Sequence, residues 1–228
     1  MKKIYWRKGL SKQKSPLIRP SGPPSPEGRR KKKALLPGGR GTKKISGAAL
    51  RERAKKIRLF AMDVDGVLTE GSIILLESGE EIKFWNVKDR IAFFMLKKFG
   101  DTFPVAWITG RKSRQVELRA GEVGVVSLHQ HCEDKGAALN AAMAAVNVRA
   151  EQTLFIGDDL VDLPALRRAG LAVCPSDAHP AVKSVCHWVT RSPGGRGVLR
   201  EVADLVLEAQ GLMAGVLEMY ENPAGHAG

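Results

Sequence analysis

The sequence predicts an α/β protein: a doubly wound parallel sheet with a short β-hairpin inserted after the first strand. Three observations lead to this prediction. Beyond residue 54, short apolar runs alternate with amphipathic helical stretches, and this order implies parallel strands covered on both faces. Two extended runs directly follow the first strand. Polar residues gather where the predicted strands end, which is where open parallel sheets bind ligands.

The elements follow from this alternation, taken in order along the chain. Short apolar runs predict strands at residues 57–64, 103–109, 125–128, 153–156, 171–174 and 187–190. Helical patterns are found at residues 90–99, 113–123, 134–146, 160–169, 178–185 and 197–210. The hairpin comprises residues 72–77 and 81–87, which are joined by Ser78, Gly79 and Glu80.

The positive charge of the chain is concentrated at its N-terminus. The sequence has 37 Lys and Arg against 24 Asp and Glu, a formal charge of +13. Residues 1–50 hold 15 of these basic side chains and a single acid, Glu27, whereas the remainder has 22 basic and 23 acidic residues. A nucleic-acid-binding domain carries its charge on the folded part, so the near-neutral remainder argues against that class.

The basic leader has the composition of a disordered segment. It is rich in Lys, Arg, Pro, Gly and Ser, with a basic run at residues 29–33, and it cannot bury enough surface to order itself. We expect a basic extension at residues 1–50, a folded domain at 51–211 and a C-terminal tail at 212–228. The leader is interpreted as a solvated tail or as translated sequence upstream of the true start. A tether for RNA or an anionic membrane and an organelle-targeting peptide remain open alternatives.

Hydropathy and cysteine usage favour a cytoplasmic protein. No apolar run is long enough to span a bilayer, and the N-terminus lacks the apolar stretch of a secretory signal. The cysteines, Cys132, Cys174 and Cys186, are odd in number and lack CxxC spacing, which is typical of reduced thiols.

Polar groups end several predicted strands and are expected to meet at one edge of the sheet. Asp63 and Asp65 end the first strand, Thr109 ends the second, and an acidic pair, Asp158 and Asp159, follows the fourth. A lysine at position 135 opens the helix after the third strand. Burying several carboxylates together is costly unless a cation compensates them, and all-oxygen ligands suit Mg²⁺. The sequence therefore predicts a magnesium site at this edge.

These motifs, in this order, resemble the four-part motif set of the haloacid dehalogenase-like phosphatases: DxDGVLT, a lone Thr, a Lys and GDDxxDLP. More narrowly, residues 57–210 are similar to the 3-deoxy-D-manno-octulosonate 8-phosphate phosphatase subfamily. The segments that carry this similarity are 62–69, 108–113, 156–164, 177–180 and 193–197. Because the insertion at residues 70–89 is short, the resemblance implies a hairpin cap and no large cap domain.

The resemblance implies a role for each acid at the site. Asp63 would be the nucleophile that forms an aspartyl phosphate, and Asp65 would protonate the leaving alkoxide and later deprotonate water. Mg²⁺ would be held by Asp63, the backbone carbonyl of Asp65, and Asp158. Asp159 and Asp162 would orient the motif lysine and the waters of the metal. Taken singly, Asp159 could instead be a helix N-cap, with Asp162 as its N3 acid.

The resemblance also assigns the groups that bind the phosphoryl oxygens. Thr109 would hydrogen-bond one oxygen, and Lys135 would pair with another while screening Asp63 from its acidic neighbours. Taken singly, Thr109 could cap the helix that starts near Ser113, and Lys135 could be a solvated lysine of a first helical turn.

The implied substrate is a sugar-acid phosphate, with 3-deoxy-D-manno-octulosonate 8-phosphate favoured over a nonulosonate 9-phosphate or another small sugar phosphate. Its carboxylate calls for nearby cations, for which Arg111 and Arg196 are candidates, although either could be merely solvated. Arg90 and His131 stand where relatives usually have glycine. Arg90 is a further candidate contact, or a group that narrows the site.

The resemblance implies a homotetramer in which neighbouring subunits complete the site, because a hairpin alone cannot roof it. Ile73 and Leu75, with Ile82 and Phe84, are expected to form one apolar contact face, although this face could instead pack on its own domain. An alternative of another class is a multimeric scaffold whose basic leader binds nucleic acid or membrane.

Overall fold

The computed structural model describes residues 45–222 of the chain. Most of the predicted leader lies outside these residues. The described part begins with α1 (Gly47–Ala54), which Ser46 caps by accepting the backbone N–H of Ala49. This helix starts inside the segment predicted as extension.

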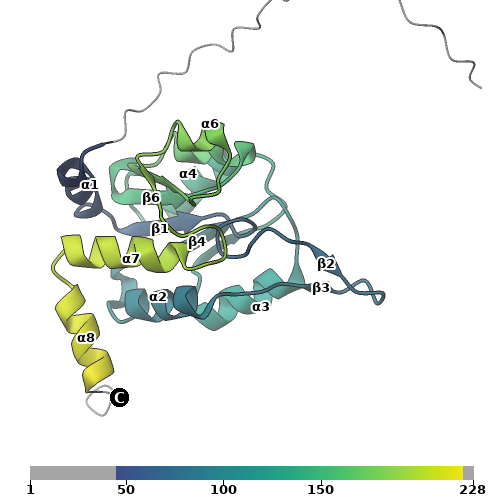
Figure 1. Cartoon of the computed structure of the whole chain (residues 1–228), viewed down its shortest axis with the longest axis horizontal. Helices are drawn as coiled ribbons and strands as arrows, with labels where there is room; N and C mark the ends of the chain where they lie inside the picture. The colour runs from purple at the N-terminus through teal and green to yellow at the C-terminus, as the bar shows by residue number, and fades with distance from the viewer. Residues whose placement is uncertain (1–44, 223–228) are drawn as a thin grey trace, which may run out of the picture. The chain divides into compact units, whose positions relative to one another are not determined.

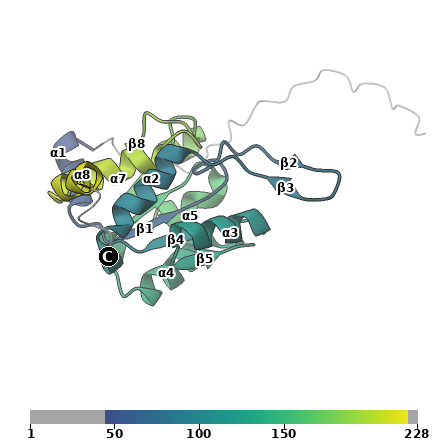
Figure 2. The same ribbon diagram turned by 90° about the horizontal axis from the view of Figure 1, so that it is seen from below.

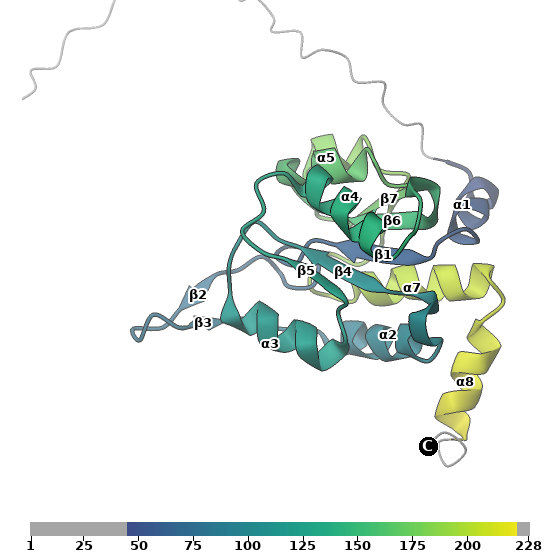
Figure 3. The same ribbon diagram turned by 180° about the vertical axis from the view of Figure 1, so that it is seen from behind.

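The core of the fold is a six-stranded parallel sheet, as predicted, in the order β5-β4-β1-β6-β7-β8. Its strands are β1 (Leu59–Met62), β4 (Val105–Ile108), β5 (Ser127–His129), β6 (Thr153–Ile156), β7 (Leu171–Cys174) and β8 (Trp188–Val189). After β5 the chain returns to the other side of β1, so β1 lies between β4 and β6 at the point where the strand order reverses (Figure 3). Such a switch point is where ligands bind in open α/β sheets.

Helices cover both faces of the sheet, which confirms the doubly wound prediction (Figures 1 and 2). Phe60 and Met62 face a core shared with α2, α3 and α7, whereas Leu59 and Ala61 face a core shared with α4, α5 and α6. The alternation along β1 therefore serves two layers. The helices of the two layers are α2 (Val87–Lys97), α3 (Arg114–Val123), α7 (Val198–Ala209), α4 (Lys135–Ala145), α5 (Leu163–Leu166) and α6 (Pro180–Lys183).

Several helices differ in their bounds from the prediction, for local reasons. The helix α2 begins at Val87 because the Asn86 side chain caps it by accepting the Lys88 N–H. The helix predicted at residues 160–169 is a 3-10 turn, η3 (Leu160–Asp162), followed by the short α5. Two further 3-10 turns, η1 (Gly100–Thr102) and η2 (Ala150–Gln152), precede β4 and β6.

The predicted C-terminal tail contains a helix, α8 (Met213–Glu221), whose Val216 is buried in the α2–α7 core. Among the described residues, no helix is long and apolar enough to cross a membrane.

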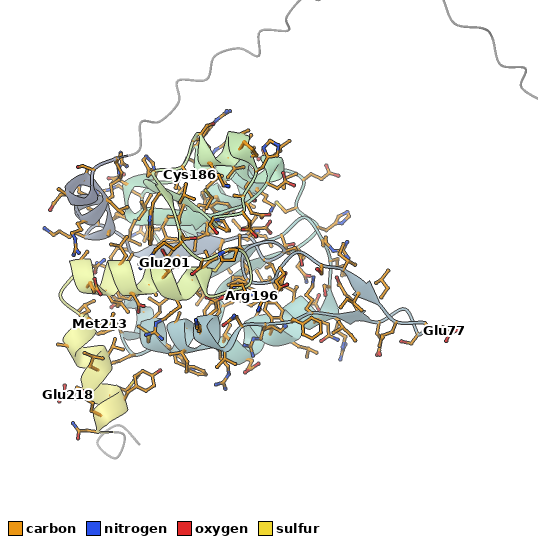
Figure 4. All side chains as sticks on the ribbon, in the orientation of Figure 1. Glu77, Cys186, Arg196, Glu201, Met213 and Glu218 are labelled. Carbon is orange, nitrogen blue, oxygen red and sulfur yellow. The ribbon has the colours of Figure 1, made fainter. Side chains whose placement is uncertain are left out.

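The predicted hairpin is present but shorter than expected, with β2 (Ile74–Leu75) antiparallel to β3 (Glu81–Ile82). It projects from the sheet and carries Glu77 at its tip (Figures 2 and 4). Ile74 pairs with Ile82, and Leu75 pairs with Glu81. Because side chains alternate along strands, Leu75 and Ile82 lie on opposite faces, so the prediction of one apolar face containing both was wrong.

The apolar side chains of the hairpin are exposed in the single chain. Leu75 is 66% exposed and Phe84 is 68% exposed. The alternative in which the hairpin packs on its own domain is therefore wrong.

Candidate active site

The carboxyl ends of β1, β4 and β6 enclose a pocket of about 350 Å³ that brings together most of the predicted site. The predicted residues in its lining are Asp63, Asp65, Thr109, Arg111, Lys135, Asp158 and Asp159. The pocket is also lined by Glu70, Val161 and Asp177. Val161 and Asp177 lie in the segments that carry the family similarity, but none of the three had been assigned a role at the site. Another hollow, of about 410 Å³ and lined by Arg58, Pro104 and Val126, lies by the amino ends of the strands, away from this acidic cluster.

Lys135 is buried between two carboxylates. Its Nζ lies 2.6 Å from Asp63 Oδ2 and 2.7 Å from Asp162 Oδ1, and its side chain is 1% exposed. Asp134 caps α4 and so places Lys135 at the first helical position. Burial opposes the charge on Lys135, but the two carboxylates outweigh it and raise the pKa of Lys135. The interpretation of Lys135 as a solvated lysine is wrong, and the site keeps a cation beside Asp63.

Asp162 orients this lysine while closing the turn after β6. Its second oxygen, Oδ2, accepts the backbone N–H groups of Asp158 at 2.8 Å and Asp159 at 3.2 Å. Asp159 accepts the N–H of Leu160 at 2.7 Å and is the N-cap of η3, with Asp162 as the N3 acid. The alternative interpretation of this pair as a capping box is therefore also correct. Of the two predicted supporting acids, only Asp162 contacts Lys135.

Thr109 lies at the end of β4 and is 1% exposed. Its Oγ1 accepts the Arg111 N–H at 3.3 Å, and Ser113 is the N-cap residue of α3. The interpretation of Thr109 as the cap of this helix is therefore wrong. Its hydroxyl hydrogen remains available to a ligand in the pocket.

Asp63 and Asp158 form an acidic cluster that fits a divalent cation. Asp63, Asp158 and Asp162 each offer one carboxylate oxygen as a possible metal ligand, and these three oxygens lie within 4.8 Å of one another. Both oxygens of Asp162 are already engaged, whereas Asp158 Oδ1 is buried and has no hydrogen-bond partner in the described part of the chain. Burial first, and then the charge of Asp162, raise the pKa of Asp63 above its ordinary value and that of Asp158 to about 7. A cation bound here would compensate both carboxylates.

The backbone of the loop after β1 lies very close to the Asp158 side chain. Gly66 has a φ of 94°, and a Cβ at this position would lie 2.1 Å from Asp158 Oδ2. Only glycine can hold the loop after β1 this close to the acid.

The raised pKa values predict how stability depends on pH and on metal. Between about pH 4 and pH 7 the folded protein binds more protons at Asp158 than the unfolded chain, so stability falls as pH rises through this window. We expect the metal-free protein to lose of order 1–4 kcal/mol from this group. Added Mg²⁺ should remove most of the loss. Thermal unfolding across this pH range, with chelator and with Mg²⁺, checks this; a pH dependence that Mg²⁺ leaves unchanged would contradict it.

Prediction did not find the network of charges that surrounds Asp65. Lys83 Nζ contacts Asp65 Oδ1 and lies 3.1 Å from Glu81 Oε1. Arg111 lies 3.1 Å from the same Glu81 oxygen and 4.0 Å from Asp65 Oδ2. The available signal was a pair of opposite charges two residues apart, Glu81 on β3 and Lys83 just after it, which had been assigned only to the polar side of the hairpin.

The other two predicted arginines do not line the pocket. Arg90 lies 3.2 Å from Glu122 Oε1 on α3, with its guanidinium over the Phe94 ring, so the structure does not bring it to the pocket of its own chain. Arg196 lies 2.7 Å from Glu70, which does line the pocket. Figure 4 shows Arg196 in the loop before α7.

His131 has a φ of 53°, in the left-handed region that favours glycine. The backbone at this position thus has a conformation that favours glycine although the side chain is bulky, as the resemblance led us to expect.

This fold and this acidic edge define a haloacid dehalogenase-like hydrolase, and a family of that description matches residues 107–202. A 3-deoxy-D-manno-octulosonate 8-phosphate phosphatase from Yersinia pestis is 42% identical over 164 residues, 72% of this chain and 87% of that protein. The chain belongs to the 3-deoxy-D-manno-octulosonate 8-phosphate phosphatase family, whose members hydrolyse phosphoric monoesters.

Solved structures agree with this assignment. The Moraxella catarrhalis phosphatase of this name, in complex with a magnesium ion, a phosphate ion and KDO, superposes with a TM-score of 0.74 at 35% identity over 77% of this chain and 99% of that one. A cobalt-bound deoxy-D-mannose-octulosonate 8-phosphate phosphatase from Haemophilus influenzae gives a TM-score of 0.67 at 36% identity, over 70% and 92% of the two chains.

Proposed function

We propose that this protein hydrolyses 3-deoxy-D-manno-octulosonate 8-phosphate to the free sugar acid and phosphate, with Mg²⁺ as cofactor. The observation that carries the proposal is the buried Asp63, held beside Lys135 and near the unpartnered oxygen of Asp158. The complex of the Moraxella catarrhalis relative with magnesium, phosphate and KDO supports the substrate and the cofactor.

In this mechanism two carboxylates have different roles: Asp63 is the nucleophile, and Asp65 is the general acid and base. A carboxylate oxygen of Asp63 attacks phosphorus, and the bond between phosphorus and the ester oxygen breaks. Asp65 gives its proton to the leaving alkoxide and becomes a carboxylate. In the second step, Asp65 takes a proton from water as that water attacks the aspartyl phosphate, which releases phosphate and restores Asp63.

The remaining groups stabilise the charge of the phosphoryl oxygens. Lys135 supplies a fixed cation, and the Thr109 hydroxyl supplies a hydrogen-bond donor. Bound Mg²⁺, held by Asp63, Asp158 and the backbone carbonyl of Asp65, would withdraw further charge from these oxygens. Arg111, which lines the pocket, would face the sugar carboxylate.

Phosphate release from a panel of phosphate esters tests this function. The panel contains the octulosonate 8-phosphate, a nonulosonate 9-phosphate and common sugar phosphates, each assayed with Mg²⁺ and with chelator. We expect the highest kcat/KM on the octulosonate ester and loss of activity with chelator. A higher value on the nonulosonate ester would move the substrate to that class, and no Mg²⁺-stimulated release from any ester would overturn the function.

We also propose that the protein is a homotetramer whose hairpins pack together and whose neighbouring subunits complete the pocket. The exposed apolar side chains on both faces of the hairpin support this assembly, since monomers seldom expose so large an apolar surface.

Phe84→Asp is expected to weaken this assembly, because it places a charge in the apolar contact. Sedimentation velocity should show a smaller species at concentrations where the wild type is assembled. Leu217→Asp on α8 is the matched control, since Leu217 is also exposed, at 53%, and lies outside the hairpin. An unchanged sedimentation coefficient for Phe84→Asp would contradict the proposed contact.

We infer a cytoplasmic location from cysteine usage, because the three cysteines are odd in number and lack CxxC spacing, and two of them, Cys174 and Cys186, are buried. Most of the basic leader lies outside the described residues, and its binding to nucleic acid or membrane stays an open alternative. Deleting residues 1–44 should leave turnover unchanged; a loss of salt-sensitive RNA or vesicle binding on deletion would assign the leader a function of its own.

A further inference from the structure

Lys83 is a residue of the hairpin, and its side chain contacts Asp65 of the candidate active site. Its side chain is 1% exposed, although it follows the two-residue strand β3. Its Nζ contacts Asp65 Oδ1 and lies 3.1 Å from Glu81 Oε1, so its charge is shared by two carboxylates. Asp65 lines the pocket and Lys83 does not.

We propose that Lys83 is a positioning residue, which fixes the carboxyl group of Asp65 for proton transfer to the leaving group. The inference rests on the proposed function, in which Asp65 is the acid and base of the reaction. It gives the hairpin a part in the chemistry, in addition to its part in subunit contact.

The two oxygens of Asp65 differ in a way that supports this role. Oδ1 is held by Lys83, whereas Oδ2 is buried and has no hydrogen-bond partner among the described residues. Arg111 Nε lies 4.0 Å from Oδ2, which is beyond hydrogen-bond distance. This Nε also has no hydrogen-bond partner within residues 45–222. One oxygen is thus anchored, and the other remains available for the leaving group.

The charge of a buried lysine must be compensated, and here the compensating ion pairs connect three segments of the chain. Glu81 Oε1 receives both Lys83 and Arg111, so β3, the loop after β4 and the loop after β1 are joined through Asp65 and Glu81. A hairpin with two residues in each strand is marginal alone, so these ion pairs also determine where it lies. Displacing Lys83 would release Asp65 from its fixed orientation.

The test compares leaving groups in the first chemical step, under single-turnover conditions with Mg²⁺. Lys83→Met should slow release of the alcohol from the octulosonate 8-phosphate by about 10-fold to 100-fold, as expected when a reacting group loses its fixed position. Release of p-nitrophenol from p-nitrophenyl phosphate should fall much less, because that leaving group needs little protonation. In steady-state assays of Lys83→Met, KM should stay near the wild-type value. Lys83→Arg should recover part of the single-turnover rate on the octulosonate ester. Lys97→Met, an exposed lysine at the far end of α2, is the matched control.

A second comparison asks whether Lys83 acts through Asp65. In an Asp65→Asn background, Lys83→Met should cause little further loss on the alkyl phosphate, because the group that it positions is already gone. Full additivity of the two losses, equal loss on aryl and alkyl phosphates, or a rise in KM with kcat intact would each overturn the proposal. If Lys83→Met does not fold, by circular dichroism, Lys83→Gln takes its place in the same comparisons.

Failure of this proposal can be distinguished from failure of the proposed substrate. If the wild-type enzyme prefers another alkyl phosphate of the panel, the Lys83 comparison is made on that ester. A selective loss there would support the role of Lys83 even with the octulosonate ester excluded.

Discussion

Asp63→Asn is expected to abolish turnover on every phosphate ester, alkyl or aryl. An amide cannot form the aspartyl phosphate, and no other described carboxylate lies between Lys135 and the pocket in its place. We expect kcat to fall by roughly 10⁵-fold or more, the scale seen when a covalent nucleophile is removed.

The same substitution should not destabilise the metal-free protein near neutral pH. Asp63 is buried beside Asp162, and both burial and that neighbour disfavour its charge. Replacing it by a neutral amide removes this repulsion, so the thermal midpoint should stay equal or rise while activity is lost. Lost activity with a lowered midpoint would indicate misfolding instead.

Two measurements check this prediction: phosphate release at high enzyme concentration, and acid-quenched labelling of the protein by a radioactive phosphate ester. The wild type should show transient label, and Asp63→Asn should show none. Asp204→Asn, on α7 and paired with Arg200, is a matched carboxylate-to-amide control that should keep wild-type activity. Residual turnover of Asp63→Asn within 100-fold of wild type would mean that another group is the nucleophile.

The residues that sequence located best are those whose position is determined by topology alone. Asp63, Thr109 and Asp158 each follow a strand of a parallel sheet, and the carboxyl ends of such strands meet at one edge whatever the details of packing. Lys135 was found for a related reason, because it is the first residue of the helix after β5.

What sequence did not locate depends on tertiary contacts. The contact of Lys83 with Asp65 requires the register of a four-residue ladder and the orientation of the hairpin relative to the loop after β1, and neither is specified by local pattern. The same register places Leu75 and Ile82 on opposite faces of the hairpin, whereas we had assigned them to one face. Arg90 was a candidate contact because it stands where the resemblance implies a glycine, but as a residue of α2 it contacts Glu122 of α3 instead.

Lys135→Met is expected to cause the second-largest loss, and it should reduce both activity and stability. The substitution leaves Asp63 and Asp162 buried without their shared cation, and breaking a buried ion pair on one side costs about 3–5 kcal/mol. It also removes a cation from the phosphoryl oxygens, for which we expect a loss of about 10³-fold in kcat/KM.

A second substitution separates the two effects. In Lys135→Met/Asp162→Asn one of the two uncompensated carboxylates becomes an amide, whose oxygen can still accept the N–H groups of Asp158 and Asp159. We expect this double variant to regain much of the lost stability in chemical denaturation, since the remaining buried charge no longer has a like-charged neighbour. Its activity should stay as low as that of Lys135→Met, because the phosphoryl oxygens still lack their cation. Recovery of activity together with stability would show that Lys135 serves only to hold the fold, and would remove it from the catalytic mechanism.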